Sequence, residues 1–308
     1  MGVENVIIYT YYISARATKI TLLCLRGNKS KNRTDGRRIT MIYDLQKASM
    51  WKRISAFLFD IILFCIVAVG IAFLLSSLLG MDAQQNKAIE ICGRYAEEYG
   101  LDAFLTEEEL DGAITLALTV ERQGELTEEQ AAAFQGAVEA LRNDKEYLHA
   151  YGMVGQLILL VVTFSLLVSN LVLEFVLPLL FKNGQTIGKK IFGVAVMRID
   201  GVKASPVMLL IRALLGKYAV ETMIPVFVLL SFILGTASIV NVILLLMLIL
   251  AQIILLIFTQ ARTPIHDMLA GTVTVDFASQ LIFDTPEDLL EYKKKLHAES
   301  VAEKAQNS

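Results

Sequence analysis

Apolar residues in this chain lie in long blocks rather than in narrow stripes along otherwise polar segments. Such blocks predict helices that cross a membrane, because a helix needs about 20 apolar residues to span the hydrocarbon core. The first block covers residues 54–79 and the second covers residues 153–181. Residues 218–258 would extend about 60 Å as one helix, roughly twice the thickness of that core, so we expect two spans with a hairpin at residues 235–238. The pattern predicts an all-α membrane protein, a bundle of about four transmembrane helices.

The segment between the first two blocks is polar and acidic. Residues 81–151 include 16 of the 31 acidic residues but only 5 of the 28 basic ones. Thr106 is followed by Glu109, and Thr127 by Gln130, at the spacing of capping boxes, in which paired side chains close the first turn of a helix. We therefore expect a helical extracytoplasmic insert with a solvated acidic surface, and attraction of divalent cations to that surface is the weaker alternative.

Basic residues next to the spans predict the orientation of the chain, because positive charge favours the cytoplasmic side of a membrane. Lys47, Lys52 and Arg53 precede the first span, and the segments after the second and fourth spans are also basic. We expect a multi-pass protein of the cell membrane with both termini in the cytoplasm. Residues 192–199 and 272–277 are rich in β-branched side chains and predict two short strands that pair on that side.

These patterns divide the chain into consecutive parts. The parts are an atypical N-terminal extension (1–40), the approach and first span (41–80), the insert (81–152), the second span (153–181), a basic cytoplasmic segment (182–217), two further spans (218–258), a cytoplasmic cap and strand (259–283) and a charged tail (284–308). Gly36-Arg37-Arg38, just before Met41, is what a purine-rich ribosome-binding sequence would encode if it were translated. We therefore expect translation to begin at Met41, with the first forty residues not translated.

Composition agrees with the apolar blocks and excludes other classes of protein. Of the 308 residues 55% are hydrophobic, and the mean hydropathy of +0.56 is too high for an ordinary soluble domain. The three cysteines and three histidines are too scattered to predict a disulfide framework, a metal site or a cofactor. The sequence has no ordered Ser/His/Asp set, so we do not expect an enzyme. The segregated charge indicates the lipid bilayer rather than nucleic acid as partner. Because the predicted spans are few for a transport pathway, we also expect self-association.

Two carboxylates inside the apolar blocks are candidates for chemistry, because a charge in a membrane is costly unless it meets a partner or water. Asp60 lies seven residues after Arg53, nearly two helical turns, so both side chains project from one face about 10 Å apart along the axis. Glu174 lies at a similar depth in the second span. If the spans are neighbours, Asp60 and Glu174 share a site. The alternative is that Glu174 reaches towards the membrane surface or hydrogen-bonds to Asn170.

Three phrases of the sequence are together similar to one family. They are RISAFLFD in the first span, NGQTIGKKIFGVAVMRIDG after the second and RTPIHDMLAGTVTV after the last. In wording and order they resemble the RDD family of bacterial membrane proteins. The arginine and the two aspartates of the family name carry over as Arg53, Asp60 and Asp267. The resemblance implies a small bundle of membrane helices, and transport or cation/proton exchange is proposed for some members of the family.

The resemblance also implies a cluster of Arg53, Asp60 and Asp267 at the cytoplasmic mouth of the bundle. In one interpretation the cluster binds a proton or a monovalent cation, because burial raises the pKa of a carboxyl group while a nearby arginine lowers it. In the other interpretation Arg53 pairs with one aspartate and only locks the first helix in place. His266, beside Asp267, is either part of a proton relay or an ordinary histidine of a capped helix.

The glycine-rich run that contains Lys189 and Lys190 lacks the spacing of a phosphate-binding loop. We expect both lysines to contact anionic lipid headgroups instead. Two functions follow from the sequence. One is a small transporter or exchanger of monovalent cations or protons that uses Arg53, Asp60, Asp267 and Glu174. The other is a membrane scaffold or sensor that does not transport and uses the acidic insert.

Overall fold

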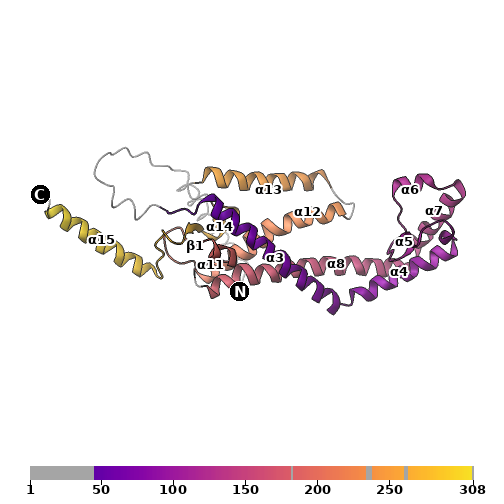
Figure 1. Ribbon diagram of the computed structural model, residues 1–308, viewed down its shortest axis with the longest axis horizontal. Coiled ribbons are helices and arrows are strands. Elements are labelled where there is room, and N and C mark those ends of the chain that lie inside the picture. Colours follow the sequence, from indigo (N-terminus) through magenta and orange to yellow (C-terminus); the bar gives the residue numbers. More distant parts are fainter. Residues whose placement is uncertain (1–44, 182, 234–237, 260–262, 307–308) are drawn as a thin grey trace, which may run out of the picture. The chain divides into compact units, whose positions relative to one another are not determined.

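The computed structural model describes residues 45–181, 183–233, 238–259 and 263–306 (Figure 1). The predicted translation start at Met41 and most of the predicted hairpin at residues 235–238 lie outside these residues. The chain divides into two compact units. We call Met1–Cys65 together with Ser169–Ser308 the sheet unit, and Ile66–Val168 the insert unit.

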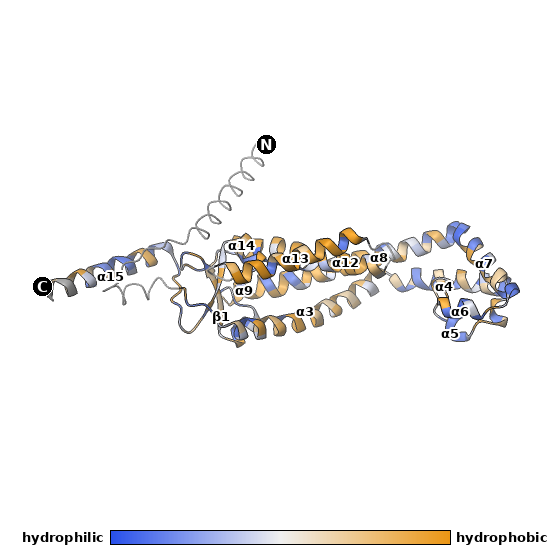
Figure 2. Ribbon diagram, turned by 90° about the horizontal axis from the view of Figure 1, so that it is seen from above, coloured by the Kyte–Doolittle hydropathy of each residue, from blue (hydrophilic) through white to orange (hydrophobic). Residues whose placement is uncertain are grey.

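Four helical segments among the described residues are long and apolar enough to cross a membrane, which confirms the predicted fold class. Figure 2 shows apolar residues along much of these segments. The first is α3 (Met50–Leu78) and the fourth is α13 (Ile239–Phe258). The second joins α8 (Lys145–Leu171), the π-helical turn η2 (Val172–Val176) and α9 (Leu177–Leu180), and the third joins α11 (Pro206–Ile211), the π-helical segment η3 (Arg212–Met223) and α12 (Ile224–Ile233).

The third span begins at Pro206, well before the predicted start at residue 218. Ser205 caps it, because its side chain accepts a hydrogen bond from the Met208 amide, and Pro206 occupies the first position, where its missing N–H costs nothing. Arg212 and Lys217 thereby belong to a helix of membrane-spanning length and not to the predicted basic cytoplasmic segment, residues 182–217. An apolar helix tolerates these charges because carboxylates on other elements neutralise them, as the candidate site shows.

A small antiparallel sheet pairs β1 (Val194–Arg198) with β2 (Thr272–Asp276), which confirms the predicted strand pair. Alternate residues of the two strands bury one face, a core of Ala195, Met197, Val273 and Val275. Helix α10 (Ile187–Ile191) precedes β1, and helix α14 (Ile265–Ala270) precedes β2. Each strand therefore continues directly from a short helix that carries polar residues of the candidate site. The charged helix α15 (Pro286–Gln306) follows the sheet.

The insert unit contains its own hydrophobic core between short helices. These are α4 (Met81–Glu98), η1 (Leu101–Ala103), α5 (Glu107–Leu110), α6 (Val120–Glu125) and α7 (Glu128–Asn143). Both predicted capping boxes are present, at Thr106 with Glu109 and at Thr127 with Gln130. Burial raises the pKa of Cys92, in the middle of this core, to about 11, so its thiol is protonated at neutral pH.

Replacing Thr127 by alanine should destabilise the start of α7 by about 1 kcal/mol, because the Gln130 amide loses the side-chain oxygen that accepts its hydrogen bond. Hydrogen exchange should quicken at the first amides of α7. The Thr127→Ser variant keeps the hydroxyl and should exchange like the wild type. Equal exchange in Thr127→Ala would show that this cap contributes nothing.

Candidate functional site

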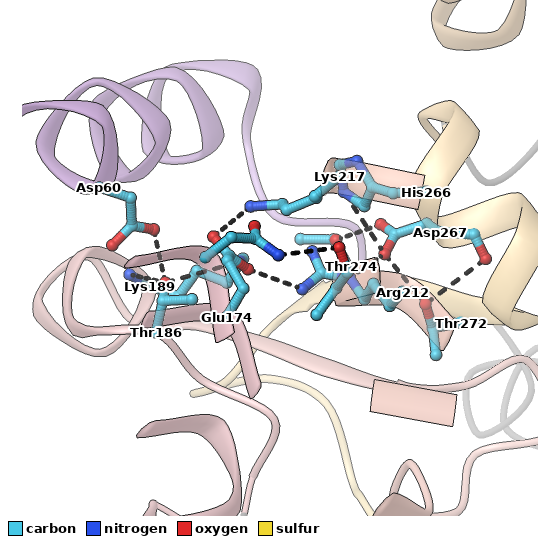
Figure 3. A network of polar contacts seen from close by, with 12 residues as sticks. Asp60, Glu174, Thr186, Lys189, Arg212, Lys217, His266, Asp267, Thr272 and Thr274 are labelled. Atoms are coloured by element: carbon cyan, nitrogen blue, oxygen red, sulfur yellow. Dashed lines mark hydrogen bonds and ion pairs between the residues drawn. The ribbon is translucent and has the colours of Figure 1, made fainter. Parts of the chain in front are cut away.

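The sheet unit buries a network of charged side chains (Figure 3). Arg212 and Asp267 are 1% and 0% exposed, and Glu174 and Lys189 are also buried. Charges this deep are stable only when each has a partner of opposite sign or several hydrogen bonds. The network therefore decides how the surrounding helices pack.

Glu174, in the π-helical turn η2, meets three cationic side chains. Its Oε2 lies 3.3 Å from Nη1 of Arg212 and 3.7 Å from Nζ of Lys189, and its Oε1 accepts a closer bond from Lys217. A hydrogen bond between Glu174 and Asn170 was one of the alternatives predicted from the sequence. The Asn170 side chain donates to the Ala213 carbonyl at 2.9 Å instead. The second and third spans are thus joined by both contacts.

Asp267, in α14, binds the other side of the same arginine. Nε of Arg212 lies 2.7 Å from Oδ1 of Asp267, and the hydroxyls of Thr272 and Thr274 donate to the carboxylate at 2.9 and 2.8 Å. Burial alone would raise the pKa of Asp267, but Arg212, His266 and the Thr274 hydroxyl hold it well below its usual range. Asp267 is therefore ionised at neutral pH, and Arg212 bridges two carboxylates.

His266 extends the network towards the fourth span. Its Nδ1 lies 2.8 Å from both carboxylate oxygens of Glu221, and Gln252 of α13 donates to Glu221 as well. Burial, with help from Arg212, lowers the pKa of His266, although Asp267 and Glu221 oppose that shift. The histidine thus belongs to the network rather than only to the end of a short helix.

η3 and α14 approach so closely only because Gly216 has no side chain. A Cβ at Gly216 would lie 2.4 Å from Cα of His266. This close contact places His266 and Asp267 of α14 beside η3, which contains Arg212.

Asp60 of α3 lies at the other end of the network and has different partners. Its Oδ2 accepts a hydrogen bond from the Thr186 hydroxyl, and its Oδ1 accepts one from the Gly188 amide at 2.8 Å. Within the part of the chain that the structure describes, Asp60 forms no ion pair. A Cβ at Gly188 would lie 2.4 Å from the Ala56 carbonyl oxygen, so a glycine is needed where α10 meets α3. The anion held by this glycine-rich turn is therefore the chain's own carboxylate.

Arg53 donates hydrogen bonds to two backbone carbonyls. It donates to Ala48 at 3.2 Å and to Thr274 at 2.6 Å. Thr274 thus accepts from Arg53 through its carbonyl oxygen and donates to Asp267 through its hydroxyl. The three residues of the predicted cluster contribute to one region, but Arg53 and Asp60 bind different partners, and Asp267 pairs with Arg212.

Lys189 connects the two ends of the network. Its Nζ lies 3.4 Å from the Thr186 hydroxyl oxygen and 3.7 Å from Oε2 of Glu174, and it is buried. Burial and the neighbouring guanidinium of Arg212 lower the pKa of Lys189 from 10.5 to about 7. This position differs from the headgroup contact expected for Lys189, because the side chain turns inward to a carboxylate. Lys190 is exposed, with its Nζ 4.1 Å from the centre of the Phe181 ring.

Sequence reasoning did not identify Arg212, Lys217 and Glu221 as site residues. A usable signal was present, since Arg212 and Lys217 interrupt apolar sequence five residues apart. That spacing does not match an α-helical face, but a π-helix forms bonds between residues five apart, so it places them together. Among the described residues, no group of three or more His, Cys, Asp or Glu side chains is arranged to hold a metal ion.

Comparison with known proteins supports one relationship. Neither the curated proteins nor the solved structures include a match to this chain. The sequence profile of the RDD family matches residues 47–271, which are most of the chain. They include all the charged side chains of the network, whereas Thr272 and Thr274 follow the matched region. The resemblance of the three phrases is thus confirmed, and this chain belongs to the RDD family of membrane proteins.

Proposed function

We propose that this protein exchanges monovalent cations for protons across the bilayer, with Asp60 as the carboxylate that takes the cation. The observation that carries the proposal is the environment of Asp60. Its carboxylate lies in an apolar helix of membrane-spanning length and accepts hydrogen bonds from two neutral groups, the Thr186 hydroxyl and the Gly188 amide. A carboxylate held this way keeps a negative charge available to a small cation, which prefers oxygen ligands.

The network behind Asp60 supplies groups for the proton half of the exchange. Polar contacts run from Asp60 through Thr186 and Lys189 to Glu174. From Glu174 they continue through Arg212 to Asp267. His266 and Glu221 then connect Asp267 to Gln252 in the fourth span. Each of the four membrane-spanning segments contributes at least one side chain. A change of charge at one residue alters the electrostatic energy of the next, so cation binding on one helix can affect proton binding on another.

The orientation and assembly belong to the same proposal. Lys47, Lys52 and Arg53 favour a cell-membrane protein whose sheet and both termini lie in the cytoplasm, with the acidic insert of residues 81–152 outside. We expect self-association, because the few spans of one copy leave little room between them for a transport pathway. Helix α13 presents apolar side chains such as Ile239 and Phe258 outward, towards lipid or another copy.

A scaffold or sensor is the second candidate, and a different observation favours it. Glu174 and Asp267 are both paired with buried cations, an arrangement that fixes the positions of the helices without any movement of ions. In that case the network is structural, and the acidic insert performs the function.

Proteoliposomes distinguish the two candidates. The purified protein, with a pH-sensitive dye inside the vesicles, should change the internal pH when a Na⁺, K⁺ or Li⁺ gradient is imposed. Asp60→Asn should reduce that change to the level of empty vesicles, because the amide lacks the charge. Its oxygen can still accept from the Gly188 N–H, and its NH₂ group can donate to the Thr186 hydroxyl. Asp200→Asn is the matched control and should remain active, because Asp200 lies in the turn after β1 and forms an exposed ion pair with Arg198. A wild type without a response to any of the three gradients contradicts exchange and favours the scaffold.

A further inference from the structure

We propose that Lys189 is the residue that binds and releases the exchanged proton, and that a cation at Asp60 and a proton on Lys189 exclude each other. This inference rests on the proposed function, because it assigns the second half of the same exchange to a particular side chain.

The contacts around Glu174 single out Lys189. Three cations share this one carboxylate, so their mutual repulsion favours the loss of one positive charge. Arg212 keeps its proton in proteins and is held by two carboxylates, and Lys217 has the closest contact with Glu174. Lys189 has the longest contact, 3.7 Å, so it has the least to lose on becoming neutral.

The charged groups that face Lys189 come from every element packed around it. They are Glu174 in η2, Arg212 and Lys217 in η3 and Asp60 in α3. Burial and the two cations favour the neutral amine, while the two carboxylates favour the ammonium, and the balance brings the pKa of Lys189 to about 7. Both protonation states are therefore populated near neutral pH.

Lys189 and Asp60 are close enough to compete. The Thr186 hydroxyl donates to Asp60 and lies 3.4 Å from Nζ of Lys189, so a single oxygen separates the two groups. A cation that binds the Asp60 carboxylate places its positive charge near the ammonium and drives off a proton. The step balances: ammonium, carboxylate and free cation become neutral amine, cation-bound carboxylate and free proton. One cation enters as one proton leaves, so the total charge at the site stays constant.

Nuclear magnetic resonance can follow this exchange without transport. With ¹³C at lysine Cε in protein reconstituted into nanodiscs, the Lys189 resonance is the one absent from Lys189→Met. Its titration midpoint should lie near pH 7 in N-methyl-D-glucamine chloride and should fall by about one pH unit in NaCl, KCl or LiCl if that cation binds. Asp60→Asn should remove the dependence on the cation. Lys190→Met, which changes the exposed neighbour, should leave the Lys189 midpoint and its shift unchanged.

The outcomes separate this inference from the proposed function. A Lys189 midpoint above about pH 9 in every salt, or one that no cation shifts, overturns the inference even if the vesicles show exchange. A cation-dependent midpoint in a protein that gives no flux supports the linkage and overturns transport. In vesicles, Lys189→Arg should lose exchange, because arginine does not release its proton, whereas Lys190→Arg should remain active.

Discussion

Replacement of Arg212 by methionine should lower the free energy of unfolding by about 3–5 kcal/mol, because Glu174 loses one of its cations and Asp267 loses its closest one. Methionine fills much of the space left by the side chain but neutralises neither carboxylate. Unfolding of the purified protein in mixed micelles by added sodium dodecyl sulfate measures the change.

Two further variants test the origin of this loss. The combination of Arg212→Met with Asp267→Asn removes the charge mismatch on that side and should recover part of the lost stability. Arg198→Met breaks an exposed ion pair with Asp200, which should cost less than about 1 kcal/mol. If Arg212→Met is no more harmful than Arg198→Met, the buried network does not hold the helices together.

Gly188→Ala should destabilise the contact between α10 and α3 by about 1–3 kcal/mol and abolish exchange. The new Cβ would lie 2.4 Å from the Ala56 carbonyl oxygen and 2.8 Å from Oδ1 of Asp60, so the two helices must separate. That separation breaks the hydrogen bond from the Gly188 amide to Asp60. Thermal unfolding and vesicle flux measure the two effects.

Gly155→Ala is the matched control for this prediction. Gly155 lies in α8, and a Cβ there would meet nothing within 4 Å, so alanine should leave stability unchanged or raise it slightly through better helix propensity. Equal stability and flux for Gly188→Ala and Gly155→Ala would mean that α10 does not depend on close contact with α3.

The four spans among the described residues were predictable, because a helix that crosses a membrane needs a long, nearly continuous block of apolar residues in the sequence. The strand pair was predictable from the β-branched residues that became β1 and β2. The start of the third span was not, because Arg212 and Lys217 look unsuitable for a membrane helix until their partners are known. Those partners, Glu174 and Asp267, come from separate parts of the chain, and pairing across such distances leaves no local pattern.

The candidate site was predictable only in part. Asp60 and Glu174 were identified because a carboxylate in an apolar block is costly. Arg53 was expected beside Asp60 from their spacing on one helical face, yet its long side chain reaches the carbonyl of Thr274 in β2. Lys189 and Lys190 are adjacent and chemically identical in sequence, and only the fold directs one inward and leaves the other exposed.

The π-helical segment η3 sets the geometry of the third span. Each turn of a π-helix holds more residues than an α-helical turn, so η3 contains surplus chain between α11 and α12. Side chains beyond η3 therefore face a different direction from the one that a continuous α-helix would give them. Arg212 stands at the first residue of η3 and Glu221 near its last, so the wider winding sets the angle between the two ends of the network that the third span carries.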